Sequence, residues 1–535
     1  MNKKGLLFFL LSAAASLQVG YAQTAKEVSA VYQDLSVFAN PMATQLKKGT
    51  ALAAINKIQN KEIKAVATQL LKNQYSTTYR VAKYQPILSP TVLGHDLSIG
   101  DGYSKYENIT GIYLPIGKNV IIVDGITGET PVNLLVPNWE RRAPQGVEDP
   151  TKDPNGWGLK RQTFSLRNGV NIIDVKDFGG LAYVDYFVEE LKGQPAVEIH
   201  FLGAAVNGYF DNQRNTNADW DKLIANTVYP VLDAKGKHIQ VAYPKEALQK
   251  YAAGRGTDLI NNYDSLVYRQ HRLMGLEKHG KVPANKILAR VNYNYYMFRD
   301  GDGVAYMGVK PGYAMGMVAN PDVVIKGDPC WGFSHEVGHV HQLRPYFNWG
   351  GLGEVSNNLF SLYVTRSFGN KTRVSEQNNY STARSSIIDK RISFLQDKDV
   401  FNRLIPFWQL QLYFEGAGQN PNFYPDLFEA FRQQAKSEQP QSRGRRRGDW
   451  ASDRLAANNP AVYQLNFVKK ACEVSKTDLT GFFDQYGFFY VGEFDIEDYG
   501  DYTYKMTQEM VDNCKAAIKA MQLPKPKVDI TQLKD

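Results

Sequence analysis

The pattern that most restricts the fold of this chain is His335-Glu336-Val337-Gly338-His339, in a sequence of 535 residues that contains only 8 His. Residues four positions apart share one face of a helix, so both imidazoles point toward the same place. Glu336 then lies at the flank of that face, where it can take a proton from a water held near the two rings. The motif therefore predicts a helix that binds a metal ion.

The residues around the motif predict where its helix begins and indicate that the nearby His341 is not part of the site. Ser334 is a natural N-cap, and the upstream segment 323–327 (VVIKG) is typical of a strand. At about 100° per residue, His341 lies about 140° from the mean direction of the two motif histidines. We therefore expect His341 to be a structural residue and not a ligand.

A catalytic zinc ion needs a third protein ligand and an open position for water. The candidate is Glu354, which follows the glycine-rich loop 350–353, and a second helix is expected to begin at this acid. Asn357 or Asn358 on that helix would orient the ligands. Two His and one Glu are the ligand set of thermolysin-like zinc peptidases.

The chemistry expected of such a site is hydrolysis of a peptide bond. Zinc polarises the scissile carbonyl and lowers the pKa of its water toward about 7, and Glu336 acts as the general base. The oxyanion needs a further donor, and because no His follows His341, a downstream donor has to be a Tyr or an Arg. Tyr313 and Tyr413 are two candidates among 32 Tyr, and the sequence does not choose between them. Segment 311–317 is expected to form an edge strand that pairs with the substrate. It lacks a Glu that would hold a free amino terminus, which favours an endopeptidase.

Changes in composition predict an α+β, multidomain chain that begins with an export signal. Lys3 and Lys4 precede a short apolar run that ends on small residues, as in a signal peptide. We therefore expect an exported monomer that is periplasmic, on the cell surface or extracellular. The expected segments are a signal peptide (1–22), a helical region (23–80), a β-sandwich (81–245), a zinc-peptidase domain (246–385) and a helical C-terminal domain (386–535).

The composition also excludes several classes of protein. A hydrophobic content of 43% with 12% aromatic residues excludes a disordered chain. A net charge of +8 is small for this length and gives no reason to expect nucleic acid. Outside the signal, no apolar run approaches the length of a membrane span. Only 3 Cys are present, and Cys472 and Cys514 either form a disulfide or remain buried thiols.

Two further features each have two interpretations. The arginine-rich segment 442–450 (SRGRRRGDW) is either a contact for an anion or acidic glycan, or a solvated surface loop. Trp331 and Trp349 either stack on sugar rings near the site or belong to the core. The sequence leaves both questions open.

The motif and its surroundings resemble a known family. SHEVGHVHQ followed by GLGEVSNNLFSLYV is similar to the enhancin-like, mucin-degrading zinc metallopeptidases, of the gluzincin type. The upstream YSKYENITGIYLPIGKNV and the downstream PFWQLQLYF extend the resemblance over roughly residues 80–520. It implies that His335, His339 and Glu354 bind Zn2+ and that Glu336 is the general base.

Members of that family act on glycoproteins, notably mucins, and several accept or require an O-glycan beside the scissile bond. The resemblance therefore implies a secreted zinc endopeptidase whose partner is an O-glycosylated, mucin-type glycoprotein. The alternative is a catalytically weak or inactive glycan-binding protein that retains the zinc site.

Overall fold

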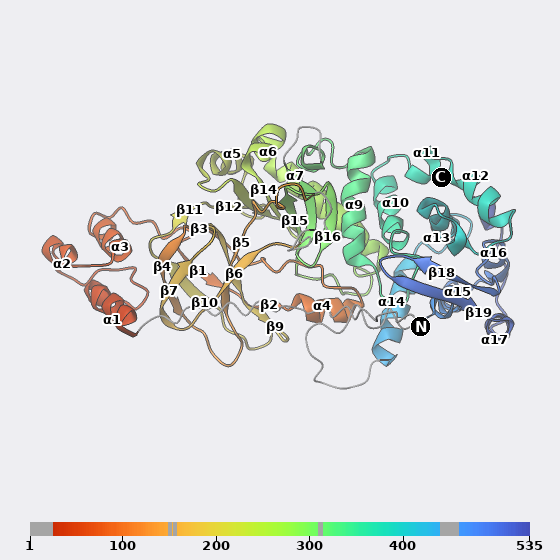
Figure 1. Cartoon of the computed structure of the whole chain (residues 1–535), viewed down its shortest axis with the longest axis horizontal. Helices are drawn as coiled ribbons and strands as arrows, with labels where there is room; N and C mark the ends of the chain where they lie inside the picture. Colours follow the sequence, from red (N-terminus) through yellow and green to blue (C-terminus); the bar gives the residue numbers. More distant parts are fainter. Residues whose placement is uncertain (1–24, 148–151, 153–157, 309–313, 439–458) are drawn as a thin grey trace, which may run out of the picture.

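The computed structural model describes residues 25–147, 152, 158–308, 314–438 and 459–535. The predicted signal peptide and the arginine-rich segment 442–450 lie outside these residues. From left to right, Figure 1 shows N-terminal helices, a pair of sheets, a third sheet with its helices, and a mainly helical C-terminal region. The chain is a mixed α/β protein. In its described part, no helix combines the length and the apolar character needed to cross a bilayer.

Two antiparallel sheets pack face to face in the first half of the chain. The four-stranded sheet has the order β1-β10-β4-β7, and the five-stranded sheet has the order β11-β3-β8-β5-β6. Side chains of both sheets, among them Ile121, Ile173, Leu134 and Val184, form one core between them. The strands are β1 (Val81–Tyr84), β3 (Ile109–Leu114), β4 (Gly117–Asp124), β5 (Asn133–Pro137), β6 (Arg161–Ser165), β7 (Gly169–Val175), β8 (Gly180–Asp185), β10 (Val197–Phe201) and β11 (Ala205–Val206).

The N-terminal helices cover the other face of the four-stranded sheet. Helices α1 (Ala25–Asp34), α2 (Leu52–Asn56) and α3 (Lys61–Leu71) share a second core with Val120 and Ile122 of β4. Strand β4 is therefore buried on both faces, which explains why its sequence is a continuous apolar run and does not alternate.

A third sheet of six strands carries the metal-motif helix on its flank. Its order is β12-β13-β14-β15-β17-β16, with β16 at one edge. The expected boundary at residue 245 differs from this topology, because β12, β13 and β14 precede it and pair within this sheet. Strand composition reveals a strand but not its pairing partner, which is set by tertiary contacts. The strands are β12 (Tyr209–Asp211), β13 (Val231–Lys235), β14 (Ile239–Pro244), β15 (Ile287–Asn292), β16 (Met297–Asp300) and β17 (Gly303–Met307).

The segment expected to form an edge strand at 311–317 is helical where it is described. Helix α8 spans Ala314–Val318, and residues 309–313, which include Tyr313, lie outside the described part. The edge strand that contacts the metal-motif helix is β16. The expected edge strand is therefore wrong for the described residues 314–317.

The C-terminal region is mostly helical but contains a β-hairpin that the sequence analysis did not predict. Strands β18 (Gly492–Glu497) and β19 (Asp501–Met506) pair antiparallel, and Glu497 lies opposite Asp501. The three remaining residues, 498–500, form the turn. The surrounding helices are α13 (Val400–Glu415), α14 (Phe423–Glu438), α15 (Pro460–Ser475), α16 (Thr480–Gln485) and α17 (Gln508–Ala520).

Candidate metal centre

The motif helix, α9, spans Gly327–His341 and is longer at its N-terminus than predicted. Lys326 is its N-cap, and Ser334 is buried within the helix and does not cap it. Segment 323–327 forms turns and the first helical residue, so the expected strand is wrong. Asp328 and Pro329 fit the first turn, where an acid is favoured by the helix dipole and proline loses no hydrogen bond.

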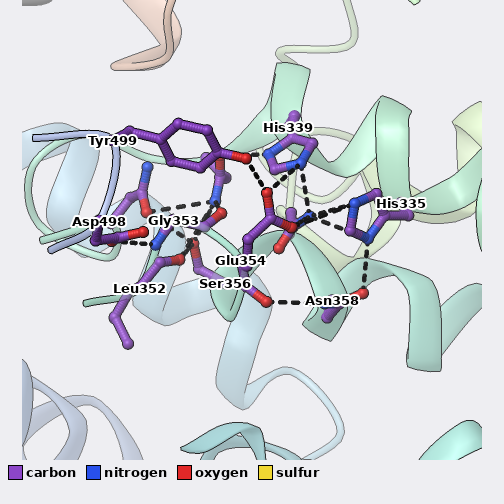
Figure 2. A network of polar contacts seen from close by, with 12 residues as sticks. His335, His339, Leu352, Gly353, Glu354, Ser356, Asn358, Asp498 and Tyr499 are labelled. Atoms are coloured by element: carbon purple, nitrogen blue, oxygen red, sulfur yellow. Dashed lines mark hydrogen bonds and ion pairs between the residues drawn. The ribbon is translucent and has the colours of Figure 1, made fainter. Parts of the chain in front are cut away.

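The second helix, α10 (Ser356–Ser367), packs closely against α9. A Cβ atom on Gly338 would lie 2.5 Å from the carbonyl oxygen of Asn357. Gly338 therefore allows the backbone of α10 to approach the motif. This approach brings Glu354, just before α10, to the two motif histidines (Figure 2).

Three acceptor groups converge at the centre of the site. Nε2 of His335 lies 3.3 Å from Oε2 of Glu354, and Nε2 of His339 lies 3.4 Å from Oε1. Nδ1 of His335 lies 2.9 Å from Oδ1 of Asn358, and Nδ1 of His339 lies 3.1 Å from Oε1 of Gln342. An amide oxygen only accepts, so each Nδ1 carries the proton and each Nε2 presents a lone pair. Lone pairs facing a carboxylate need a cation between them.

Asn357 also contacts the ligand nitrogens of both histidines. Asn357 is fully buried, and its Nδ2 lies 3.0 Å from Nε2 of His339 and 3.3 Å from Nε2 of His335. A single donor group can therefore reach both lone pairs, which places them around one point. Two imidazoles and a carboxylate at one point fit a transition-metal ion.

The protonation states favour metal binding. Burial and the neighbouring His339 lower the pKa of His335 to about 4. Burial raises the pKa of Glu354, but the hydrogen bond and positive charge that His339 presents when protonated, together with His335, outweigh this and bring it to about 2. Burial lowers the pKa of His339, but the hydrogen bond and charge of Glu354 outweigh this and raise it, so in the metal-free protein a proton on Nε2 of His339 can take the place of the cation. Near neutral pH, His335 is therefore neutral and Glu354 is ionised, as ligands must be.

Glu336 has the properties of a base beside that site. It is 5% exposed and lies on α9 next to the ligand pair. Its carboxylate and the two imidazoles form a group whose ligand atoms all lie within 4.8 Å of one another. Burial, with a further contribution from Glu354, raises the pKa of Glu336 to about 7 against the lowering effect of His339. A carboxylate with this pKa can take and return a proton near neutral pH.

Gln342 is a supporting residue that the sequence analysis missed. Its Oε1 accepts from Nδ1 of His339, and its Nε2 donates to the carbonyl of Gly353 at 2.7 Å and to Oγ of Ser356 at 2.9 Å. It therefore joins the end of α9 to the loop that carries Glu354. Its position three residues after His339, on the same helix face, was the available signal.

The turn of the C-terminal hairpin also reaches the site, as Figure 2 shows. The Tyr499 hydroxyl donates to Oε1 of Glu354, and Asp498 accepts 2.8 Å hydrogen bonds from the backbone amides of Gly351 and Gly353. Loss of water around the hydroxyl at the site and the hydrogen-bonded Glu354 raise the pKa of Tyr499 above its usual value, although the residue as a whole is exposed. The alternating pattern EFDIE and YTYKM around Asp498–Gly500 was a signal for the hairpin, but nothing in it indicates its partner.

Of the other candidate residues, Trp331 lies beside a ligand, and the rest of those described lie in the core. His341 is buried, with Nδ1 2.8 Å from Oε1 of Gln270, so its structural role is confirmed. Tyr413 is buried, and its hydroxyl accepts from the backbone amide of Lys527. Trp349 is a core residue at 2% exposure, whereas the ring of Trp331 lies 4.6 Å from the ring of His335. All three cysteines are buried and free, which confirms the interpretation without a disulfide.

The chain is similar to known proteins over most of its length. The family model for peptidase M60, enhancin and enhancin-like proteins matches residues 203–487, more than half of the chain, and the match ends before the hairpin. No curated protein matches the chain.

Solved structures share the fold. A metallopeptidase from Bacteroides thetaiotaomicron has 22% identity and a TM-score of 0.75, and covers 96% of this chain and 82% of its own. A metallopeptidase in complex with Tn antigen has 23% identity and a TM-score of 0.71, with 86% and 81% covered. The M60 catalytic domain of Clostridium perfringens ZmpC, in complex with sialyl T antigen, has 17% identity and a TM-score of 0.61, with 85% and 82% covered.

Proposed function

The chain belongs to the enhancin-like M60 peptidases and is a metallopeptidase, and on this premise we propose that it is a secreted zinc endopeptidase that cleaves O-glycosylated, mucin-type glycoproteins. The observation that carries the proposal is the set of two Nε2 lone pairs and one carboxylate directed at one point, beside the buried Glu336. The β-sandwich before the peptidase unit and the helical region after it would position this centre.

The metal would be held by His335, His339 and Glu354. Their imidazole and carboxylate groups suit Zn2+, and the hydrogen bonds that the Nδ1 groups of the two histidines donate to Asn358 and Gln342 hold the rings in one tautomer. When bound, the ion polarises the scissile carbonyl and acidifies a water molecule.

Glu336 would act as the general base and then as the general acid. Its carboxylate takes a proton from the attacking water and passes it to the leaving amine. Its pKa, raised to about 7 by burial, suits both directions of transfer. Proton transfer also gives a reason for a buried carboxylate at this position, since Glu336 is 5% exposed and its ligand atom lies close to those of the two histidines.

The substrate backbone would lie along β16, the edge strand next to α9. An edge strand has free backbone groups that can pair with an extended peptide. Trp331, half-buried beside His335, has the guanidinium of Arg373 3.5 Å from its ring centroid, so its ring would support the first ligand. The glycan part of the proposal takes its support from relatives whose structures hold Tn antigen and sialyl T antigen.

Cleavage of native and enzymatically deglycosylated mucin by the zinc-loaded wild type and by Glu336→Ala tests the proposal. We expect the wild type to cleave native mucin, deglycosylation to reduce cleavage, and Glu336→Ala to be inactive. Glu190→Ala, at an exposed position, is the matched control and should cleave as the wild type does. A wild type that binds mucin without cleaving it would instead support the glycan-binding alternative.

Metal analysis tests the ligands separately. We expect His339→Ala to lose the stoichiometric zinc that the wild type carries. His95→Ala, at an exposed position on α4 (Pro90–Leu97), should retain it. Full zinc in His339→Ala would contradict the ligand assignment.

A further inference from the structure

The turn of the β18–β19 hairpin is fixed against the loop that carries Glu354. Both hydrogen bonds from Gly351 and Gly353 end on the same oxygen, Oδ2 of Asp498. A Cβ atom on Gly353 would lie 2.5 Å from Oδ1 of Asp498 and 2.9 Å from the ring of Tyr499. Glycine at position 353 thus leaves the space that the turn occupies. The hairpin is therefore built into the site, although 145 residues separate Tyr499 from Glu354.

Tyr499 is held in an unfavourable conformation. Its φ is +54°, in the left-handed region, where a residue with a bulky side chain costs about 1–2 kcal/mol. Its side chain is the most exposed among the large hydrophobic residues of the described part, at 82%. Neither the left-handed backbone nor the exposed ring of Tyr499 stabilises the core. The one polar group that it brings to the site is its hydroxyl.

In the described part of the chain, the other hydrogen-bonding groups next to the three ligands are already engaged within the protein, and Asn357 reaches the ligands from the buried side. Both Nδ1 groups are bound to amide oxygens, and His341 is buried against Gln270. The hydroxyl of Tyr499 meets the Glu354 carboxylate from the exposed side. The hydroxyl therefore lies beside the point at which the three ligands converge, on the side from which a substrate carbonyl would approach.

We propose that Tyr499 is a catalytic residue whose hydroxyl donates a hydrogen bond to the oxyanion of the tetrahedral intermediate, with Asp498 as the positioning residue. The inference rests on the proposed peptidase function. The water oxygen bonds to the carbonyl carbon while its proton passes to Glu336. The π-electron pair of the carbonyl moves to its oxygen, which accepts the hydrogen bond from Tyr499. When the C–N bond breaks, the electron pair on the oxyanion forms the carbonyl again, and Glu336 gives its proton to the leaving amine. Tyr499 keeps its proton throughout.

Two substitutions separate the hydroxyl from the ring and the backbone. Tyr499→Phe removes only the hydroxyl, and kcat on mucin should fall by about 10²–10³-fold with KM changed by less than about threefold. Tyr499→Gly also removes the hydroxyl but relieves the left-handed backbone, so its kcat should fall at least as far while its Tm stays the same or rises. Tyr502→Phe, on the same hairpin with its ring against Gly350, is the control and should keep wild-type kcat.

Zinc affinity, measured by competition with a chelating dye, gives a readout besides activity. We expect Tyr499→Phe to retain full zinc with an affinity within about threefold of the wild type. Wild-type kcat in Tyr499→Phe would overturn the inference but leave the peptidase function intact if Glu336→Ala is inactive. A loss of zinc affinity that matches the loss of kcat would also overturn it, since the hydroxyl would then serve the ligand. A wild type without any cleavage would overturn both proposals.

Discussion

The metal centre is built from two regions that contact Glu354 in different ways. Helices α9 and α10 supply side chains that are buried or half-buried, in regular backbone, within 24 residues of one another, from His335 to Asn358. The hairpin turn supplies an exposed side chain in a left-handed conformation. The first region is stabilised by packing, whereas the second is held by the hydrogen bonds of Asp498. We therefore expect the helices to determine whether a metal binds, and the turn to determine what surrounds it on the open side.

The strongest test of the helical half is Glu336→Gln, which keeps the shape of the side chain but removes its proton transfer. We expect kcat to fall by about 10²–10⁴-fold while zinc content remains stoichiometric. Steady-state cleavage of mucin and metal analysis of the same preparation check this. Zinc loss in this variant would mean that Glu336 supports the ligands, and the division between the two regions would need revision.

Glu336→Gln should also change how the stability of the metal-free protein depends on pH. Because the pKa of Glu336 is raised from its usual value to about 7, the folded metal-free protein is most stable when this group is protonated. That contribution is complete below about pH 4.5 and is lost as the pH rises through 7. Metal-free Glu336→Gln should therefore gain about 1–3 kcal/mol over the wild type between pH 4.5 and 7. Urea unfolding at several pH values checks this, and a constant difference would contradict it.

The groups that hold the imidazoles should contribute a smaller amount. Asn358→Ala and Gln342→Ala each remove the acceptor of one Nδ1 proton, so zinc affinity should fall by about 10–100-fold. Competition with a chelating dye measures this. Asn226→Ala, at an exposed position, is the control. Wild-type affinity in both variants would show that the packing of the helices orients the rings without these hydrogen bonds.

The smallest effect on zinc is expected from the hairpin. Asp498→Ala leaves the amides of Gly351 and Gly353 without their acceptor, which should lower zinc affinity by less than about tenfold. In the same variant, kcat should fall further than zinc affinity, because Tyr499 loses its fixed position. Asp498→Asn retains an acceptor oxygen and should restore most of the activity. Equal losses of zinc affinity and kcat would remove the distinction between the two regions.

The helical half could be predicted from the sequence because its geometry is local. The spacing of His335 and His339 on a helix and the nearby Glu354 require no knowledge of distant contacts. The exclusion of His341 from the site, which the structure confirms, was based on the same arithmetic. The start of α9 differs from the prediction because Ser334, a residue type that favours N-caps, lies inside the helix, whereas Asp328 and Pro329 mark its first turn.

The distant half could not be predicted, because nothing local relates Tyr499 to Glu354. One tyrosine among 32 carries no mark of its partner, and the proximity arises only when the hairpin packs on the glycine loop. The same reason explains the misplaced boundary at residue 245. The strands from Tyr209 to Pro244 were recognisable as strands, but their membership of the third sheet depends on pairing with β15.

The burial of β4 on both faces has a consequence for protein engineering. Helices α1 to α3 and the five-stranded sheet make the four-stranded sheet the middle of three layers. A shortened version that starts at residue 80 would leave Val120, Ile122 and Val170 open to water on one face of the sheet. Such a surface favours association between molecules, so a minimal active fragment of this enzyme has to begin with α1.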